Sequence, residues 1–588
     1  MAMTGLSRLA SVCAAAALFA LLAGCGDNGA SDAVAPDTQL PDGGADADSD
    51  ASGDAQPDAE GPADTGDGNP DSADVDDAND ANDADDDADA PEQDTPPEPL
   101  SVSFPQALGG AAFANPDLYP ILPVRVAATG APDGVTVGVR GADAAAAQLG
   151  EDGQWRAAIA VDRLGEGRID LVATATRGDE TVEAVIDLHL GGKGVRVTDY
   201  EAVGAGLTPH VHTLGESVVL TWTDRSADGA ARAWLQPLNG AGQLVEDRVQ
   251  LTPDDHQAIY ARTALGDGVV CVLYQRVVED TPFVNEFRVV NLDGEVIQES
   301  VGLNPGDRFG SYGGAVAWDG SGCVMTYRVN NGSASGELYW RRWDKETGLG
   351  IAVQLAASGD NDPHGGFNPI SFIGIAATPQ HSMVTFVRQY WNPSLETRVD
   401  RAQLRVMSPD GGFVHRGFIG RERSFHWHQE IHAARIGRAL VPIWVEQSLT
   451  DPDPNPATVL QAGILDPNNP PVDGMTGHAL VDAPQNRGEP VLIEHSDHFG
   501  VLAWTDERSY VDPLAGTIQL YFEPVDNRLG RLTTGDESII RHARFIAGTA
   551  HIRGREHGGN ILLVWTDERH GNGIFDPRPE IWFEMLWF

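Results

Sequence analysis

"GGNILLVWTDERH", residues 558–570, contains the pattern that determines the fold, because similar segments recur along the C-terminal two thirds of the chain. Each segment begins with a turn that contains glycine or histidine and continues as an apolar run of four to seven residues. The segments align at one anchor position, and the anchors follow one another at fairly even intervals. The anchors are Trp222, Tyr274, Tyr327, Arg388, Trp444, Trp504 and Trp565.

The order of elements within each repeat predicts four strands. A first strand, such as "PHVHTL", precedes the anchor strand, and a third strand such as "IQLYFEPV" follows a variable loop. A turn such as Asp293-Gly294 then leads to a fourth strand. A long period with several strands in each repeat is typical of propeller blades. We therefore expect an all-β fold with a seven-bladed β-propeller over 194–588; six blades are the alternative, because the fourth repeat is degenerate.

The last nine residues, "EIWFEMLWF" (580–588), are the third strand of the seventh repeat, and no fourth strand follows. An exposed aromatic edge of this kind favours aggregation unless another strand pairs with it. The segment Val195-Arg196-Val197-Thr198 aligns with fourth strands, yet it precedes the first repeat. We expect it to pair with the terminal strand and to bury Trp582, Phe583 and Leu586.

Residues 101–193 contain short alternating strands such as "VTVGVRG" and "RIDLVATATR", separated by turns at near-regular intervals. This pattern is typical of an immunoglobulin-like β-sandwich. The segment lacks the cysteine pair of antibody domains, so it resembles the Ig-like modules of bacteria, which usually serve as spacers.

The N-terminal hundred residues predict export and tethering. Residues 1–25 have Arg8 and then a short apolar run, and Leu22-Ala23-Gly24-Cys25 resembles the lipobox of bacterial lipoproteins, which implies lipidation of Cys25. Residues 26–100 contain 25 acidic residues and no Lys or Arg, which is about half of the formal net charge of −48. Such a segment is expected to be a disordered tether, or alternatively to bind calcium. The acidity argues against a nucleic-acid partner.

The region 194–588 resembles sialidase-like and kelch-like propellers, especially the W-x-D-x-R repeat modules of bacterial lipoproteins. Because the motif recurs at equivalent positions in three repeats, we interpret it as bracing of the loop that follows the strand, and not as a catalytic centre. The residues of the motif are Asp224 with Arg225, Asp506 with Arg508, and Asp567 with Arg569.

The segment "HWHQEIH" suggests a metal site. Alternate residues of a strand share a face, which would place His426, His428, Glu430 and His432 together. A second pair, His210 and His212, lies in the first strand of the first repeat. Imidazoles suit zinc, copper or nickel, whereas histidines that line a wet channel bind only water. His210 and His432 precede their anchor tryptophans by the same interval, so both are expected near the central channel.

Two further features have competing interpretations. "LYWRRW" offers Tyr339, Trp340, Arg341, Arg342 and Trp343 as a glycan contact, or as core residues of a third strand. Cys271 and Cys323 occupy nearly equivalent positions in adjacent repeats. Second strands of neighbouring blades usually lie too far apart for a disulfide, so we expect two small buried side chains.

No G-x-S-x-G, H-E-x-x-H, P-loop or sialidase Asp-box motif is present in the sequence. We therefore expect a lipid-anchored protein of the bacterial cell envelope, in the outer membrane and facing the periplasm or the surface. Its propeller would bind a protein or glycan partner without catalysis. The alternative is a glycan-active hydrolase or lyase with its site in the propeller funnel. No cofactor is predicted apart from the metal hypotheses, and the sequence gives no oligomeric state.

Overall fold

The computed structural model describes most of the chain beyond residue 96. The signal-like segment, the tether up to residue 96 and Cys25 lie outside the described residues. Pro97–Phe588 form one compact unit. Among the described residues, no helix has the length and apolarity needed to cross a lipid bilayer. The described residues are 97–199, 207–225, 230–278, 281–304, 309–330, 336–357, 370–392, 397–420, 428–447, 458–471, 475, 477–485, 487–506, 519–532, 538–540, 551–567 and 578–588.

Two sheets form from residues 101–190, with their apolar side chains buried between them. Alternation along the strands produces this core: in β7 the side chains of Ala157 and Ile159 are buried, whereas their neighbours are more exposed. All strand pairs are antiparallel except β2 with β9. The first sheet contains β1 (Ser101–Ser103), β3 (Ile121–Thr129), β7 (Trp155–Ala160) and β6 (Gln148–Leu149) in spatial order. The second contains β2 (Ala111–Ala114), β9 (Glu180–Leu190), β8 (Gly167–Arg177), β4 (Gly134–Val139) and β5 (Ala145–Ala146).

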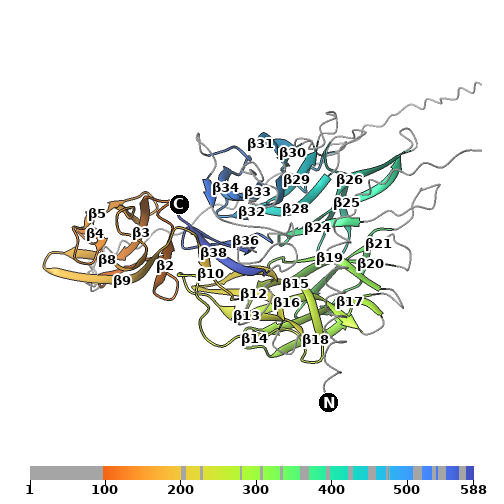
Figure 1. Cartoon of the computed structure of the whole chain (residues 1–588), viewed down its shortest axis with the longest axis horizontal. Coiled ribbons are helices and arrows are strands. Elements are labelled where there is room, and N and C mark those ends of the chain that lie inside the picture. The colour runs from red at the N-terminus through yellow and green to blue at the C-terminus, as the bar shows by residue number, and fades with distance from the viewer. Residues whose placement is uncertain are drawn as a thin grey trace, which may run out of the picture. The chain divides into compact units, whose positions relative to one another are not determined.

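Within the described part of the chain after residue 194, the strands form seven antiparallel sheets of four or five strands (Figure 1). The first two sheets are β11 (Leu207–Leu214), β12 (Ser217–Arg225), β13 (Ala231–Pro237) and β14 (Val249–Gln250), and β15 (Gln257–Gly266), β16 (Val269–Val278), β17 (Thr281–Asn291) and β18 (Val296–Gly302). The third sheet is β19 (Phe309–Trp318), β20 (Gly322–Asn330) and β21 (Gly336–Asp344), which pairs with both β22 (Gly348–Leu349) and β23 (Val353–Ala356).

The next two sheets are β24 (Ile370–Ala377), β25 (Ser382–Asn392), β26 (Thr397–Met407) and β27 (Phe413–Phe418), and β28 (His428–Ile436), β29 (Ala439–Gln447), β30 (Thr458–Ala462) and β31 (His478–Gln485). The last two are β32 (Arg487–Glu494), β33 (Phe499–Asp506), β34 (Gln519–Asp526) and β35 (Ser538–Ile540), and β36 (Arg553–His557), β37 (Asn560–Asp567), β38 (Glu580–Leu586) and β10 (Val195–Arg196).

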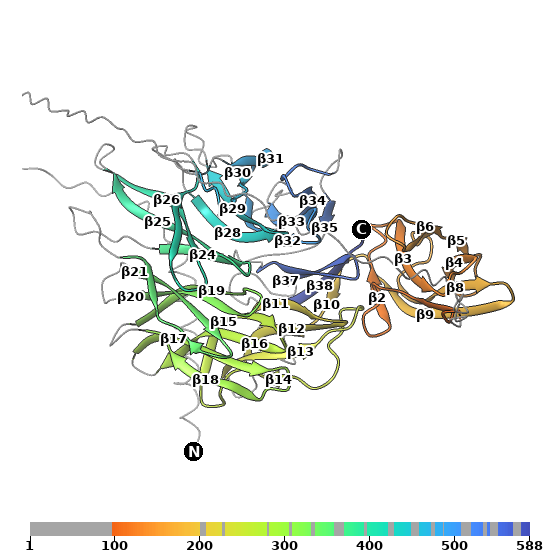
Figure 2. The ribbon, with the colours of Figure 1, turned by 180° about the vertical axis from the view of Figure 1, so that it is seen from behind.

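The first strands of these sheets contact one another in sequence around a closed ring. β11 contacts β15, each following first strand contacts the next, and β36 contacts β11. Figure 2 shows β14, β18 and β31 at the periphery of this arrangement. The fold is therefore all-β, with four-stranded antiparallel sheets arranged as in a β-propeller.

The anchor side chains lie in the middle of each sheet and are buried against neighbouring sheets. In the fourth sheet, however, the anchor is Phe386 and not Arg388. Phe386 pairs with Gln403, as Trp444 pairs with Gln461, and it is fully buried. The sequence alignment was wrong there by two residues because residues two apart on a strand share a face, so both alignments preserve the apolar pattern.

The predicted pairing between the two ends of this region is present. Val195 pairs with Phe583 and Arg196 with Trp582 in antiparallel register. The Thr198 hydroxyl accepts a hydrogen bond from the backbone N–H of Ile581 at 2.9 Å. In both ribbon views β10 runs beside β38 (Figures 1 and 2). Trp582 is 7% exposed, and Phe583 and Leu586 are fully buried, so the aromatic end of the sequence is interior.

The two-sheet region packs against the last sheet of the ring through a shared apolar core. Phe113 and Phe583 stack edge to face, with ring centroids 6.5 Å apart. The Trp587 indole donates a hydrogen bond to the backbone carbonyl of Phe113 at 2.8 Å, and the Asn115 amide donates to the Glu584 carboxyl at 3.1 Å. The region expected to be a simple spacer is therefore fixed to the ring.

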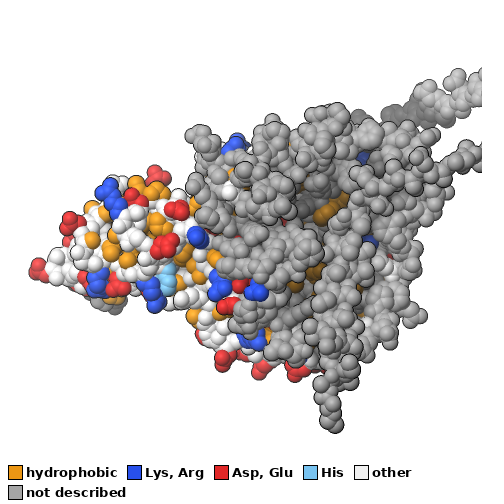
Figure 3. Space-filling view, in the orientation of Figure 1, with side chains coloured by type: hydrophobic (Ala, Val, Ile, Leu, Met, Phe, Trp, Pro, Cys, Tyr) orange, Lys and Arg blue, Asp and Glu red, His pale blue; other side chains and the backbone are white. Residues whose placement is uncertain are grey.

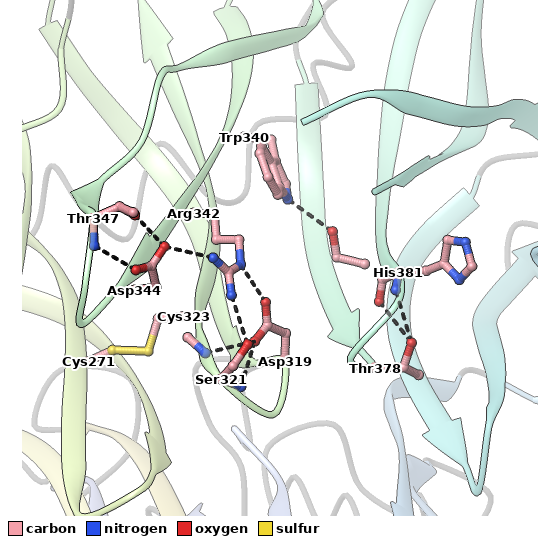
Figure 4. A network of polar contacts seen from close by, with 12 residues as sticks. Cys271, Asp319, Ser321, Cys323, Trp340, Arg342, Asp344, Thr347, Thr378 and His381 are labelled. Atoms are coloured by element: carbon pink, nitrogen blue, oxygen red, sulfur yellow. Dashed lines mark hydrogen bonds and ion pairs between the residues drawn. A yellow bond between two sulfur atoms is a disulfide. The ribbon is translucent and has the colours of Figure 1, made fainter. Parts of the chain in front are cut away.

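A disulfide joins Cys271 of β16 to Cys323 of β20, with the Cα atoms 6.5 Å apart (Figure 4). Our expectation of two unlinked side chains was wrong. Cys271 lies three residues before its anchor and Cys323 lies four before, so they project from opposite faces of their own sheets. In adjacent sheets those two faces meet, which brings the sulfur atoms together.

Replacing both cysteines, in Cys271→Ala/Cys323→Ala, is expected to destabilise the fold by about 2–4 kcal/mol, because the bridge closes a 52-residue separation in the unfolded chain. Equilibrium unfolding in guanidinium measures this as a lower midpoint. Wild-type protein kept under reductant is the control and should match the variant. Two reactive thiols in the untreated denatured protein would contradict the assignment.

Glu584 predicts a pH dependence of stability. Burial raises the pKa of its carboxyl to about 8 from an ordinary value of 4.5, so the folded state retains a proton that the unfolded state has lost. The stabilisation is complete below about pH 4.5 and declines as the pH rises to about 8. Glu584→Gln should therefore unfold at a higher temperature than wild type at about pH 8.5, with a smaller difference at about pH 5.

Thermal unfolding across this pH range measures the effect. Glu183→Gln, at an exposed carboxylate of β9, is the matched control and should follow the wild-type curve. A Glu584→Gln difference that stays constant with pH would show that Glu584 does not titrate in this way.

Candidate functional site

The first strands of the seven sheets surround a central channel with a cavity of about 660 Å³. Every one of these strands, or the residues directly before it, contributes to the lining. This volume falls in the range of small-molecule binding sites. The cavity is therefore the candidate functional site.

A recurring β-bulge shapes the channel wall. The register of the first strand shifts at the same place in several sheets, for example between Leu207 and His210 and between Ile259 and Arg262. At five of these bulges one residue adopts a left-handed backbone conformation, which is unusual for residues other than glycine. These residues are Thr208 (φ 52°), Tyr260 (50°), Gly313 (104°), Phe372 (50°) and Glu489 (46°). His551 (45°), directly before the first strand of the last sheet, has the same conformation.

Each first strand places one residue in the cavity lining, two residues after the bulge position. The chemical character of this residue differs from one side of the channel to the other. The last, first and second sheets contribute basic or imidazole side chains, whereas the third and fourth contribute only small residues. In chain order this layer is His210, Arg262, Ala315, Gly374, His432, Val491 and Arg553.

The charges of the lining do not balance. Arg435 donates to Glu494 at 2.9 Å, and Asp319 accepts from Arg342 at 2.7 Å (Figure 4). Once these two pairs are set aside, three guanidinium groups of the described lining remain against a single carboxylate. The three are Arg262, Arg553 and Arg555, and the carboxylate is Glu489.

Arg262 and Arg553 lie close enough to influence one another. Removal from bulk water lowers the pKa of Arg262 to about 9, and the positive charge of Arg553 contributes to this shift, whereas Glu489 opposes it. The Nη1 atom of Arg262 is buried and has no hydrogen-bond partner among the described residues. We call Arg262, Arg553 and the adjacent His210 the basic wall.

The histidines of the channel are neutral at physiological pH. Burial, and then the charges of Arg553 and Arg262, lower the pKa of His432 to about 3. The same causes hold the pKa values of His210 and His551 well below the ordinary value, and burial lowers that of His212 to about 3. Each of these rings therefore presents one donor and one acceptor nitrogen.

The structure brings three of the histidines predicted as metal ligands into the cavity lining, namely His210, His212 and His432. His210 and His212 stack with ring centroids 6.2 Å apart, and His212 Nε2 lies 2.9 Å from the Thr263 hydroxyl. Within the described ranges, no group of three or more His, Cys, Asp or Glu side chains is arranged to hold a metal ion.

The strand β28, which contains residues 428–432 of "HWHQEIH", does not have the uninterrupted period of two residues that a shared face would need. The strand register shifts between His428 and Glu430, which interrupts the period of two. The side chains of these two residues, and the whole of His426, lie outside the described part of the structure.

In each W-x-D motif, a buried hydrogen bond joins the tryptophan and aspartate side chains of the same strand. The tryptophan indole N–H donates to the aspartate two residues later, at 3.2 Å for Asp224, 3.4 Å for Asp506 and 3.2 Å for Asp567. Asp224 also accepts from Trp234 and, at 3.2 Å, from Arg248. The side chain of Arg225, together with Arg508 and Arg569, lies outside the described residues.

The aromatic side chains of "LYWRRW" are core residues of the third strand β21, and their burial contradicts a stacking contact between the two tryptophans and a sugar. Trp340 and Trp343 are each 2% exposed, and the Trp340 indole donates to Ser382 at 3.0 Å (Figure 4). Arg342 is held by Asp319 and Asp344. Tyr339 stacks on Tyr327 with centroids 5.8 Å apart. Arg341 also belongs to β21 and is partly buried.

Arg262, Arg553 and Glu489 were missed in the sequence because no local motif contains them. Arg262 and Arg553 nevertheless share a signal with His210 and His432, because all four stand at the same interval before the anchor of their repeat. Extending that alignment to every repeat would have identified both arginines.

No protein-family model matches the chain, and no curated protein matches it significantly. Among solved structures, the α-L-arabinanase of Penicillium chrysogenum in complex with arabinobiose is 12% identical, with a TM-score of 0.37, over 57% of this chain and 97% of that one. The polysaccharide lyase Uly1 is 10% identical, with a TM-score of 0.36, over 64% and 89%. The ectodomain of the parainfluenza virus 5 hemagglutinin-neuraminidase is 9% identical, with a TM-score of 0.33, over 56% and 82%. At these values the likeness gives no information on activity, and the fold described above follows from strand pairing.

Removal of the aspartate in the first W-x-D motif tests its structural role. Asp224→Ala should destabilise the protein by at least about 2 kcal/mol, because two buried indole N–H groups and Arg248 lose their acceptor. Denaturant unfolding measures the change. Asp170→Ala, which removes the 50%-exposed partner of Arg140, is the control and should cost no more than about 1 kcal/mol. Equal effects of the two substitutions would exclude this role for Asp224.

Proposed function

We propose that the protein is a lipid-anchored binding protein of the bacterial cell envelope that engages a glycan or protein partner through the channel. In this proposal Cys25 carries the lipid, residues 26–100 form the tether, and the sheets of 101–190 are an Ig-like sandwich. The ring of 194–588 is then a seven-bladed propeller closed by β10. The outer membrane is the proposed location.

The blade count is supported by the sheets of the described residues and by the ring of contacts between their first strands. The Ig-like assignment is supported by two facing sheets of mainly antiparallel strands with a core of alternating residues. On the face of the sandwich seen in Figure 3, acidic, basic and apolar side chains are intermixed and form no single patch. The channel is therefore the better candidate for recognition.

The observation that carries the binding proposal is the composition of the described cavity lining. It contains polar and charged side chains that converge on a volume of about 660 Å³. Two of its three carboxylates, Asp319 and Glu494, are already paired with arginine. Glycoside hydrolysis by the common mechanisms needs two carboxylates that flank the scissile bond. The described lining offers one beside the basic wall, which favours binding over hydrolysis.

A glycan-active lyase or hydrolase is the second candidate, and a specific observation favours it. Glu489 lies close to Arg262, Arg553 and the neutral His551, whose backbone N–H donates to the Glu489 carboxylate at 2.5 Å. A carboxylate can act as a general base, and guanidinium groups beside it can stabilise the anion that forms when a proton is removed. Mass spectrometry of glycans after incubation with the protein would distinguish the candidates, since only an enzyme shortens its ligand.

Filling the cavity tests the proposed site. Ala315 lies in the lining, and Ala315→Trp is expected to abolish binding of any glycan or protein captured by the wild type, because the indole would occupy the channel. Binding is measured on a glycan array and by affinity capture from envelope extracts, using the fragment 97–588, which is one compact unit.

Ala315→Ser is the matched control and should bind as wild type does. Thermal unfolding of both variants establishes that they are folded. If a folded Ala315→Trp variant still binds fully, recognition takes place outside the channel and the proposed site is wrong.

A further inference from the structure

We propose that the two-sheet region of residues 101–190 is a clasp that holds the ring closed, and that the ring opens at one place when this clasp is displaced. That place is the seam, by which we mean the contact between the last sheet (β36–β38 with β10) and the first sheet (β11–β14). The proposal concerns how the fold is held together and does not depend on which ligand occupies the channel.

The first argument is the distribution of the apolar cores. Six clusters of buried apolar side chains in the described part of the ring are each built from two adjacent sheets and their connecting residues. The cluster at the seam is different, because it continues into the two-sheet region. It contains Trp222 of the first sheet, Phe583 of the last sheet and Phe113 of β2. Residues that share one core tend to open together, so the two-sheet region and the seam are expected to open as a unit.

The second argument is that the two-sheet region contacts both sides of the seam. On the side of the last sheet, β2 contacts β38 and lies beside it in both ribbon views (Figures 1 and 2). On the side of the first sheet, the backbone N–H of Gly240, in the turn between β13 and β14, donates to the Leu108 carbonyl at 2.9 Å. A Cβ atom at Gly240 would lie 2.1 Å from the Ala111 carbonyl oxygen, so the two backbones are in direct contact. A region attached to both sheets resists their separation.

The third argument is the short connection between the two-sheet region and the closing strand. β9 ends at Leu190 and β10 begins at Val195, so the position of β9 restricts that of β10. The connection runs close to the last sheet, because a Cβ atom at Gly194 would lie 3.0 Å from the Phe583 carbonyl oxygen. β10 itself contributes only Val195 and Arg196 to the strand pairing. Such a short strand depends on its surroundings to stay in register.

The fourth argument is the path of the chain. The chain passes directly from each sheet of the ring to the next, whereas the last sheet is joined to the first only through β10. If β10 leaves β38, only noncovalent packing keeps β36 beside β11. Opening is therefore expected at the seam before it occurs between any other two sheets, and the clasp opposes it.

The test is hydrogen–deuterium exchange of the full chain, read by mass spectrometry. Gly240→Ala places a methyl group against the Ala111 carbonyl and should push the two-sheet region away from the first sheet. The reporters are β10 and β36, which lie on the other side of the seam from the substitution. Their exchange should become about 10- to 100-fold faster, as expected when a packed contact is overfilled. Exchange in β20 and β29, far from the seam in chain order, should stay unchanged.

Phe113→Ala is the reciprocal variant. It removes the ring that packs on Phe583 of the last sheet, and its reporter is β11 of the first sheet, where exchange should also become faster. Gly302→Ala, in β18 of the second sheet, is the matched control. A Cβ atom there has room, with its nearest neighbour 3.8 Å away, so exchange should match wild type in every sheet.

Wild-type protein in increasing denaturant gives a second measurement that requires no variant to fold. The amides of β2, β10 and β36 should exchange as one cooperative unit, before those of β20 and β29. Separate exchange of β2 and β10 would overturn the proposal. It would also be overturned if exchange in either variant became faster only in the sheet that carries the substitution or contacts it, or became faster equally in all seven sheets.

Discussion

The antiparallel pairing of Val195 and Arg196 with Phe583 and Trp582 is the contact on which the ring depends. Each other sheet is built from one continuous stretch of chain, whereas this one takes its outer strand from a segment that precedes all the other sheets of the ring. Without that strand, β38 would present an unpaired aromatic edge, which is a template for aggregation. Closure also keeps β36 beside β11, so the channel is surrounded on all sides.

The chemistry of the channel follows from how the first strands are built. A bulge with a left-handed residue, as at Tyr260 and Glu489, displaces the strand at a fixed place in several sheets. The following residues line one cavity although they come from repeats far apart in sequence. The seven positions of one layer have diverged to basic, imidazole, small and apolar residues, so a symmetric scaffold encloses an asymmetric site. Such a site would favour one orientation of a bound ligand.

The all-β class, the repeat and the ring closure could be predicted from the sequence. The spacing of apolar residues and the aromatic anchor positions are visible within short stretches of the chain. Three expectations failed where geometry between strands decided the outcome. The anchor of the fourth sheet was misplaced because Phe386 and Arg388 share a face. The disulfide was rejected on distance, although the one-residue offset of Cys271 and Cys323 relative to their anchors already indicated facing sides of adjacent sheets. The alternation expected from His426 to His432 ignored the bulge between His428 and Glu430.

Arg262 and Arg553 could not be identified from local motifs, because the site that contains them exists only after the ring closes.

The distribution of the closing strands along the chain sets an order for biosynthesis. β10 leaves the ribosome before any of the seven first strands, and β38 leaves after all of them. The growing chain therefore cannot complete its ring until residue 586 has been made, and every intermediate has an open gap next to β10. A protease or chaperone that recognises this gap would act on unfinished molecules and spare finished ones.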